Sequence, residues 1–387
     1  MLNPKTVGVI GNGVVVHIPT LLKEMEQLEE AGLDLTGRLM LSDRAHIVFD
    51  FHQEMDGHNE KKLGRNKLGT TKKGIGPAYA SKVHRNGLRV GDLRFFDQFK
   101  KRLVDLAHHA EAANGGALEI DVEKELRYYE SIREKIVGMT TDTIALTNDS
   151  FKDGKRILIE GANATMLDID FGTYPYVTSS NPSIGSVCTG LGLAPTKLSN
   201  IFGTVKAYCT RVGEGPFPTE LGGDTAGALR EQGGEFGTTT GRPRRCGWLD
   251  VPQMRYSSLV NGYTALNLTK LDVLTGLDEV MIGVAYKHEG VKLDNMPSNL
   301  EVLSGVEVEY ESMPGWKEDI SACSAFEDLP ANAQAYVRRI EDLVGVPVRW
   351  IGVGQERTAI IDRASPGSPP SVPGLSKSGN TGTEETS

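Results

Sequence analysis

Residues 237–245 combine the side chains and the backbone types that bind small anions. The stretch runs Gly237, Thr238, Thr239, Thr240, Gly241, Arg242, Pro243, Arg244 and Arg245. Glycine lets backbone amides converge on a bound group, threonine hydroxyls donate further hydrogen bonds, and arginine offers paired donors that match carboxylate and phosphate oxygens. A solvated basic surface loop has a similar composition. The interpretation as an anion site therefore depends on other passages of the chain.

A second passage with the same chemistry occupies residues 69–77. It combines Gly69, Thr70, Thr71 and Lys72 with a further lysine and two more glycines. The G-x-x-x-x-G-K-[ST] spacing of a P-loop is absent from the whole sequence, so a phosphate site here must be built from loops of another kind. A flexible surface loop rich in glycine and lysine is the alternative.

The tetrapeptide Thr269-Lys270-Leu271-Asp272 directly follows an apolar run that predicts a strand. A carboxylate just beyond a strand end can accept the two parallel N–H donors of guanine, while the aliphatic stem of a lysine covers the base. Adenine lacks this donor pair, so Asp272 would favour guanine. A salt bridge at a strand end, or the start of a helix, explains the same four residues.

Carboxylates, hydroxyls and amides alternate through residues 160–181, after another predicted strand. This is the usual place for a ligand in an open α/β sheet. Asp168 and Asp170 share one face of an extended segment, which allows a metal pair or an acid/base pair. Capping and turn hydrogen bonds explain the two aspartates equally well.

Strands and helices alternate along the chain and would position these passages. Short apolar runs predict strands near residues 156–160, 201–208, 264–271, 280–286 and 346–352, and the first of these reads as a buried strand. Helical spacing predicts helices near residues 21–31, 95–113, 118–137, 254–262 and 332–344, while the polar residues 56–76 predict a loop. The expected fold class is α/β, with a large, mostly parallel central sheet flanked by helices and with antiparallel hairpins toward the C-terminus. The composition changes near residue 362, so we expect one domain over residues 1–361 and a disordered tail rich in Ser, Pro, Gly and Thr over residues 362–387.

The net charge of −9 over 387 residues argues against nucleic acid as a main partner, because phosphate-backbone binding needs a basic face. Small anions suit the short basic loops better. The 4 cysteines show neither metal-ligand spacing nor a disulfide framework, which fits a reduced, cytoplasmic location. No apolar run reaches membrane-spanning length, so no membrane partner is expected.

The run from Gly74 to Arg85, GIGPAYASKVHR, carries the strongest resemblance to a known family. It fits the G-I-G-P-x-Y-x-x-K-x-x-R signature of adenylosuccinate synthetase at every fixed position, including Lys82. Residues 160–181, 237–250, 269–272, 313–316 and 352–354 also resemble stretches of that family. The resemblance extends from about Asn3 to Ile361.

This resemblance implies an enzyme that joins IMP to L-aspartate with GTP as co-substrate and Mg²⁺ as cofactor, in the synthesis of AMP. It implies IMP contacts from Thr71, Asn163, Thr178 and Arg242, and from Arg85 across a homodimer, with Lys82 in support. It implies aspartate contacts from Thr238, Thr239, Thr240, Gly241, Arg242, Pro243 and Arg244. It implies GTP contacts from Arg244, Lys270, Leu271, Asp272, Gly352, Val353 and Gly354. Pro243 departs from the family pattern, where a basic residue is usual, and it removes a backbone donor.

Two motifs of the family do not occur in this sequence. They are a Q-W-G-D-E-G-K-G loop, whose aspartate is the catalytic base and a magnesium ligand, and a G-H-N-A-G-H segment, whose last histidine is the catalytic acid. No catalytic residue or metal ligand is therefore assigned here, and His17, His46 and His52 do not match the second motif. We expect a sequence that lacks its N-terminal portion, through a start site placed too far downstream, and a chain that is inactive as it stands. The alternatives are a non-catalytic nucleotide-binding paralogue or partner subunit and, on the Thr269–Asp272 motif alone, an unrelated GTPase-like switch.

Overall fold

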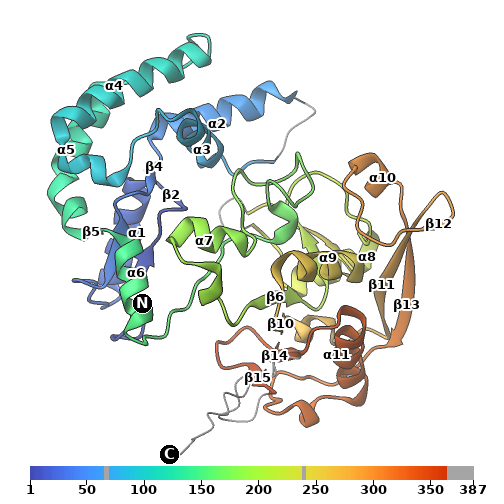
Figure 1. Ribbon diagram of the computed structural model, residues 1–387. Coiled ribbons are helices and arrows are strands. Elements are labelled where there is room, and N and C mark those ends of the chain that lie inside the picture. Colours follow the sequence, from blue (N-terminus) through green and yellow to red (C-terminus); the bar gives the residue numbers. More distant parts are fainter. Residues whose placement is uncertain (65–68, 238–240, 364–387) are drawn as a thin grey trace, which may run out of the picture.

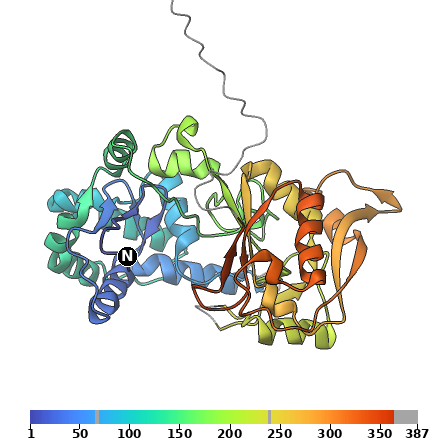
Figure 2. The same ribbon diagram turned by 90° about the horizontal axis from the view of Figure 1, so that it is seen from below.

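The computed structural model describes residues 1–64, 69–237 and 241–363. Within these ranges the helices and strands form two lobes that lie side by side (Figures 1 and 2). The buried apolar side chains form two clusters, one drawn from residues 16–136 and the other from residues 207–361. Each lobe is therefore organised around a core of its own.

The N-terminal lobe is built on short parallel strands. Strand β3 (Leu39–Ser42) pairs with β1 (Gly8–Ile10) on one side and with β5 (Thr140–Thr141) on the other. Strands β2 (Val15–Val16) and β4 (His46–Ile47) form a second parallel pair. Six helices surround these strands: α1 (Ile18–Glu30), α2 (Asp50–Lys62), α3 (Ile75–His84), α4 (Phe96–Ala113), α5 (Val122–Met139) and α6 (Thr143–Lys152).

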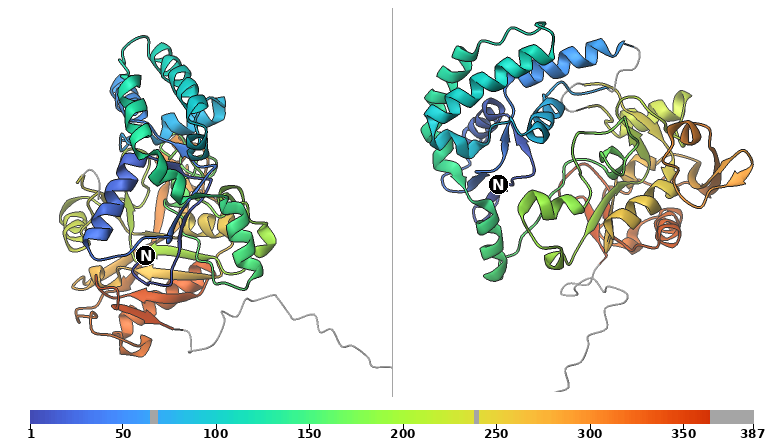
Figure 3. Two further views of the ribbon diagram at one scale, coloured as in Figure 1. Left: turned by 90° about the vertical axis from the view of Figure 1, so that its left-hand side faces the viewer. Right: turned by 45° about the horizontal axis from the view of Figure 1, so that its top comes forward.

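Helices α4 and α5 lie against each other at the outer side of this lobe (Figure 3). Phe99 of α4 and Tyr129 of α5 meet each other and Phe49, with ring centroids 5.3 to 6.3 Å apart. Asp121 caps α5 by accepting the Lys124 amide, and Asp142 caps α6 by accepting the amides of Ile144 and Ala145. Local capping and aromatic packing together fix the ends and the inner faces of these helices.

The C-terminal lobe contains a four-stranded sheet in the order β15-β14-β10-β6. Strands β6 (Phe202–Lys206), β10 (Ala265–Thr269) and β14 (Val348–Gly352) are parallel, and β15 (Ile360–Asp362) is antiparallel to β14. The long strand β11 (Glu279–His288) pairs antiparallel with β12 (Val291–Lys292) and β13 (Glu307–Pro314), and parallel with β9 (Leu249–Asp250). Strands β7 (Cys209–Arg211) and β8 (Arg245–Gly247) form an antiparallel pair.

The helices of this lobe are α8 (Gly223–Gln232), α9 (Val251–Asn261), α10 (Leu300–Ser304) and α11 (Ala331–Val344), and α7 (Gly185–Leu191) lies toward the other lobe (Figure 1). Single-turn 3₁₀ helices connect several elements, among them η5 (Leu271–Leu274) directly after β10. None of the described helices is long and apolar enough to cross a membrane.

The mixed α/β class and the antiparallel strands toward the C-terminus are confirmed, but the expectation of one large central sheet is wrong. Strands β1 and β6 end their sheets, and no strand among the described residues joins the two. Residues 156–160, predicted as a buried strand, are extended coil in which 87% of Leu158 is exposed. An apolar run becomes a strand only where a neighbour completes its hydrogen bonds, and no described residue does so here.

The predicted loop over residues 56–76 is also partly wrong, because α2 extends to Lys62 and α3 begins at Ile75. The buried face of α2 includes His52, Asp56 and Glu60, so the helix carries little hydrophobic periodicity. At the other end, Asp362 closes strand β15. Residues 364–387 lie outside the described residues, and the disordered tail stays a prediction.

Candidate functional site

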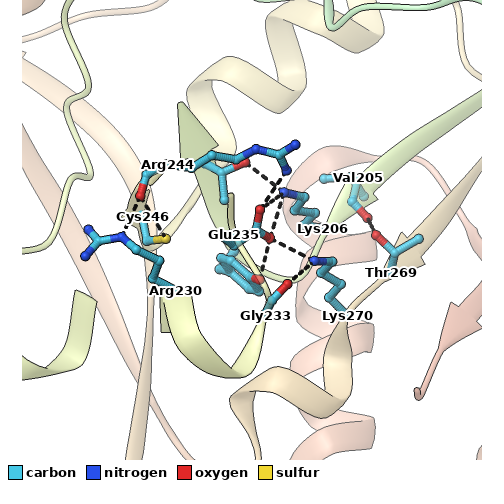
Figure 4. A network of polar contacts seen from close by, with 11 residues as sticks. Val205, Lys206, Arg230, Gly233, Glu235, Arg244, Cys246, Thr269 and Lys270 are labelled. Atoms are coloured by element: carbon cyan, nitrogen blue, oxygen red, sulfur yellow. Dashed lines mark hydrogen bonds and ion pairs between the residues drawn. The ribbon is translucent and has the colours of Figure 1, made fainter. Parts of the chain in front are cut away.

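The carboxylate of Glu235 lies at the centre of the candidate site and is fully buried (Figure 4). Its Oε2 lies 2.7 Å from Lys206 Nζ and 2.8 Å from Arg244 Nη1. Its Oε1 lies 3.0 Å from Lys270 Nζ and accepts a hydrogen bond of 2.7 Å from the Tyr208 hydroxyl. The parallel pairing of β6 and β10 brings the two lysines together, because they stand at the carboxyl ends of adjacent strands.

This cluster holds three cations around one carboxylate, and therefore carries a net charge of about +2 at neutral pH. Burial alone would raise the pKa of Glu235, but the hydrogen bonds and charges of Lys206, Tyr208 and Lys270 outweigh burial and lower this pKa to about 2. The carboxylate thus remains ionised at neutral pH and fixes the cations beside it. The uncompensated positive charge suits a phosphate or a carboxylate ligand.

The Thr269–Asp272 motif and the 352–354 turn lie next to each other, as a shared nucleotide site requires. A β-carbon placed on Gly352 would lie 3.3 Å from Thr269 Cα and 3.5 Å from the Lys270 amide nitrogen. Asp272 Oδ1 is buried and has no hydrogen-bond partner among the described residues, and burial raises the pKa of this carboxyl group. A buried acceptor without a partner is costly unless a ligand donates to it.

Two of the predicted GTP residues, Leu271 and Val353, direct their side chains into the protein core. Both side chains are fully buried in the C-terminal core, where they pack against other apolar residues. Their side chains therefore stabilise the fold. Gly354 continues the turn, which is closed by a hydrogen bond from the Val353 amide to the carbonyl of Ala359.

The predicted anion loop is closed at its base by backbone hydrogen bonds. The Gly237 amide donates to the carbonyl of Arg242 at 2.8 Å, and the Gly241 amide donates to the carbonyl of Gly237 at 2.7 Å. Gly241 has a φ of +62°, which favours glycine. Pro243 forms an isolated bridge with Phe236. Thr238, Thr239 and Thr240 lie outside the described residues.

The loop that carries Thr71 is attached to α2 at both ends by buried acidic side chains. Glu60 Oε1 accepts the Gly69 amide at 2.7 Å, and Asp56 Oδ2 accepts the Gly74 amide at 3.1 Å. The loop lies beside the anion loop of the other lobe, because a β-carbon on Gly69 would lie 3.7 Å from Arg242 Nη1. Thr71 itself is exposed. The structure thus brings the two glycine- and threonine-rich passages together.

The loop of residues 163–183 is organised by the buried carboxylate of Asp168. Its Oδ1 accepts the amides of Asp170 and Phe171 and the side-chain amide of Asn181, at 2.9, 3.2 and 2.9 Å. Its Oδ2 accepts the amide of Ser183 at 3.1 Å. This pattern is that of a capping aspartate, which was one of the two open interpretations.

Ser179, the residue after Thr178, lies against the start of α3, since a β-carbon on Gly76 would lie 3.1 Å from Ser179 Oγ. Asn163 and Arg85 are exposed, and among the described residues neither side chain forms a hydrogen bond or ion pair with Thr71 or Thr178. Arg85 ends α3 with a φ of +65°. The predicted IMP residues are therefore only partly gathered within one chain.

Comparison with known proteins identifies the family. The family described as adenylosuccinate synthetase matches residues 1–361. The chain belongs to the adenylosuccinate synthetase family. A solved structure, described as fully ligated adenylosuccinate synthetase from Plasmodium falciparum, is 46% identical with a TM-score of 0.90 and covers 94% of this chain and 86% of that one.

Three curated adenylosuccinate synthetases extend this similarity. Those of Phaeodactylum tricornutum and Phytophthora infestans are each 62% identical over 366 residues, which are 94% and 95% of this chain and 69% and 66% of the relatives. The chain thus spans about two thirds of the length of these relatives. The protein of Ostreococcus tauri, named as chloroplastic, is 54% identical over 362 residues, covering 93% of this chain and 75% of that protein.

The histidines His17, His46 and His52 near the N-terminus have side-chain partners or are buried. His17 Nδ1 lies 2.7 Å from Thr20 Oγ1, and its Nε2 lies 2.9 Å from Asp50 Oδ1. Burial lowers the pKa of His52 to about 3, and burial together with nearby cations lowers the pKa of His46 to about 4. Both groups are therefore neutral at physiological pH.

The described residues contain no Mg²⁺ site made of protein ligands alone. No group of three or more His, Cys, Asp and Glu side chains that could hold a metal ion exists in the described ranges. Asp168 accepts four protein donors, and Asp170 Oδ2 accepts the side-chain amide of Asn181 at 2.6 Å. These oxygens are occupied by the loop that they hold.

Several site residues were not predicted from the sequence: Glu235, Lys206, Tyr208, Asp56 and Glu60. Glu235 lies two residues before the anion loop, and its partners include lysines that are 29 and 35 residues away. The spacing of His52, Asp56 and Glu60 at intervals of four could have indicated one polar helix face turned toward a partner.

Proposed function

We propose that this chain binds GTP, L-aspartate and IMP, and serves the GTP-dependent ligation of IMP to aspartate that yields adenylosuccinate. The observation that carries the proposal is the joint placement of the cationic cluster around Glu235, the unpartnered Asp272 carboxylate and the 352–354 turn. Family membership supports the same conclusion. The three ligands are anionic, in keeping with the positive cluster.

The guanine base would lie between the Lys270 stem and the turn of Gly352, Val353 and Gly354. Asp272 Oδ1 would accept N–H donors of the base, which satisfies the buried oxygen. Arg244 would reach both GTP and aspartate. The backbone of Leu271 completes this part of the site.

The aspartate carboxylates would be bound by Thr238, Thr239, Thr240, Gly241, Arg242 and Arg244, with Pro243 shaping the loop. IMP would be bound by Thr71, Asn163, Thr178 and Arg242, with Lys82 in support. The exposed position of Arg85 supports a contact with IMP in a second copy of the chain, and hence a homodimer.

In the family reaction, the six-position oxygen of IMP takes the terminal phosphoryl group of GTP, and the amine of aspartate then displaces phosphate at that carbon. The residues described here would bind and orient the ligands. General acid–base groups each contribute about 10² to 10⁴ in rate, and the motifs that carry them in the family are absent from the 387 residues. We therefore expect these residues alone to bind ligands without ordinary turnover. The described residues offer no Mg²⁺ site made of protein ligands alone.

The test is calorimetric titration of the purified 387-residue chain with IMP and with GTP, together with an assay of GTP-dependent adenylosuccinate formation. Binding of both nucleotides without turnover is the expected result, and it equally suits a non-catalytic subunit that pairs with an active one. Turnover at an ordinary rate would contradict the expected inactivity but not the proposed ligand binding. A folded chain that binds neither nucleotide refutes the proposed function. The cytoplasmic location stays a prediction. The chloroplast is the alternative, because the relative from Ostreococcus tauri is named as chloroplastic.

A further inference from the structure

We propose that Glu235 is a positioning residue that links the GTP part of the site to the aspartate part, and that guanine selectivity depends on it. This inference rests on the proposed function, because it assigns guanine recognition to Lys270 and Asp272. Glu235 is fully buried and lies among protein cations, so it acts through them and not on a ligand directly.

The first link is the side chain of Lys270. Its ammonium group donates hydrogen bonds to Glu235 Oε1, at 3.0 Å, and to the carbonyl of Gly233. Its backbone has a φ of +60°, an unfavourable conformation for a residue other than glycine, which persists only where the surroundings enforce it. With the backbone and the ammonium group both fixed, the aliphatic stem between them is held in one orientation beside Asp272.

The second link is Arg244. Its Nη1 lies 2.8 Å from Glu235 Oε2, and its backbone amide donates to the Glu235 carbonyl at 2.8 Å. Its Nε is buried without a hydrogen-bond partner among the described residues. Glu235 thus fixes the side chain while leaving other guanidinium donors, the Nε among them, for a ligand.

The Glu235 carboxylate therefore orients Lys270 in the proposed GTP part of the site and Arg244 in the proposed aspartate part. Lys206 bonds both Glu235 oxygens and Thr210 Oγ1, so its donors are used within the protein and its charge helps to keep Glu235 ionised. Replacing Glu235 with Gln would leave three cations without a counter-charge. Lys270 and Arg244 would then separate, and the Lys270 stem would no longer hold the base against Asp272.

The deciding experiment measures Kd for GTP and for ATP by calorimetry with the wild-type chain, Glu235→Gln and Glu220→Gln. Glu220 pairs with Arg245 outside the cluster and is the matched control. Loss of one charged hydrogen bond predicts that Glu235→Gln lowers the ratio of the ATP Kd to the GTP Kd by about tenfold. Glu220→Gln should leave the ratio unchanged, and a general loss of structure would weaken both nucleotides by the same factor.

A folded Glu235→Gln chain, checked by circular dichroism, that keeps the wild-type ratio overturns the inference and leaves the proposed function intact. If Glu235→Gln does not fold, Tyr208→Phe decides, because it removes one hydrogen bond to Oε1 and retains the charge. A smaller fall in the ratio is then expected, and an unchanged ratio overturns the inference. A wild-type chain without preference for GTP refutes the proposed guanine site and this inference with it.

Discussion

Replacing Asp168 with Asn should destabilise the loop that presents Thr178, because the buried carboxylate accepts four donors at 2.9 to 3.2 Å. An asparagine oxygen can keep the three donors on the Oδ1 side, but its NH₂ group would then face the Ser183 amide. The variant loses the charge-assisted bond from the Ser183 amide and leaves this amide facing another N–H donor. The three remaining hydrogen bonds also weaken, because they no longer end on a charged oxygen. The expected loss in the free energy of unfolding is about 3 kcal/mol.

The assay is urea unfolding at pH 7, followed by circular dichroism, with Asp170→Asn as the matched control. Asp170 is exposed and also bonds Asn181, so its replacement should cost less than about 0.5 kcal/mol. IMP affinity should fall in the Asp168 variant and not in the control, because Thr178 donates its amide to the Leu167 carbonyl within the same loop. Equal stability of the two variants would refute the assigned role of Asp168.

Three further predictions concern pH, the loop of residues 69–74 and an exposed apolar side chain. The pKa of Glu235 is lowered to about 2, so its contribution to stability is present above its ordinary pKa and is lost as the pH falls. The gap in unfolding free energy between wild type and Glu235→Gln should therefore narrow by about 2 kcal/mol between pH 7 and pH 3, and a constant gap in urea titrations would contradict this. Combined replacement of Asp56 with Asn and Glu60 with Gln should release the loop and weaken calorimetric IMP binding by about tenfold. Unchanged affinity in a folded variant would show that the two acids do not position Thr71. Replacing Leu158 with Ser should change the free energy of unfolding by less than about 0.5 kcal/mol. A loss of several kcal/mol would instead support the buried strand that the sequence predicts.

The elements that follow simple apolar patterns were predictable from the sequence. Helices α4, α5 and α11 bury regular apolar stripes, and strands β6 and β10 are short apolar runs. Helix α2 escaped prediction because its buried face is partly polar. The prediction of a buried strand over residues 156–160 was wrong because an apolar run indicates burial but does not show whether a neighbouring strand is present.

The site could be predicted as a set of loops but not as a charge network. The glycine- and threonine-rich passages and the Thr269–Asp272 motif are local in sequence, so their chemistry is readable there. The cationic partners of Glu235 lie at the end of β6, just after β10 and just before β8, and only the pairing of β6 with β10 reveals why two lysines meet at this carboxylate. Likewise, burial in the core separates the side chains of Leu271 and Val353 from the ligand role that the motif gave them.

The most direct test of the nucleotide site is calorimetric titration of the wild-type chain and Asp272→Asn with GTP and with ATP. The unpartnered Asp272 oxygen predicts that the wild-type chain binds GTP at least about tenfold more tightly than ATP, and that the variant loses this preference. Equal affinity of the wild-type chain for the two nucleotides, or an Asp272→Asn variant that keeps the preference for GTP, would contradict a guanine site at this position.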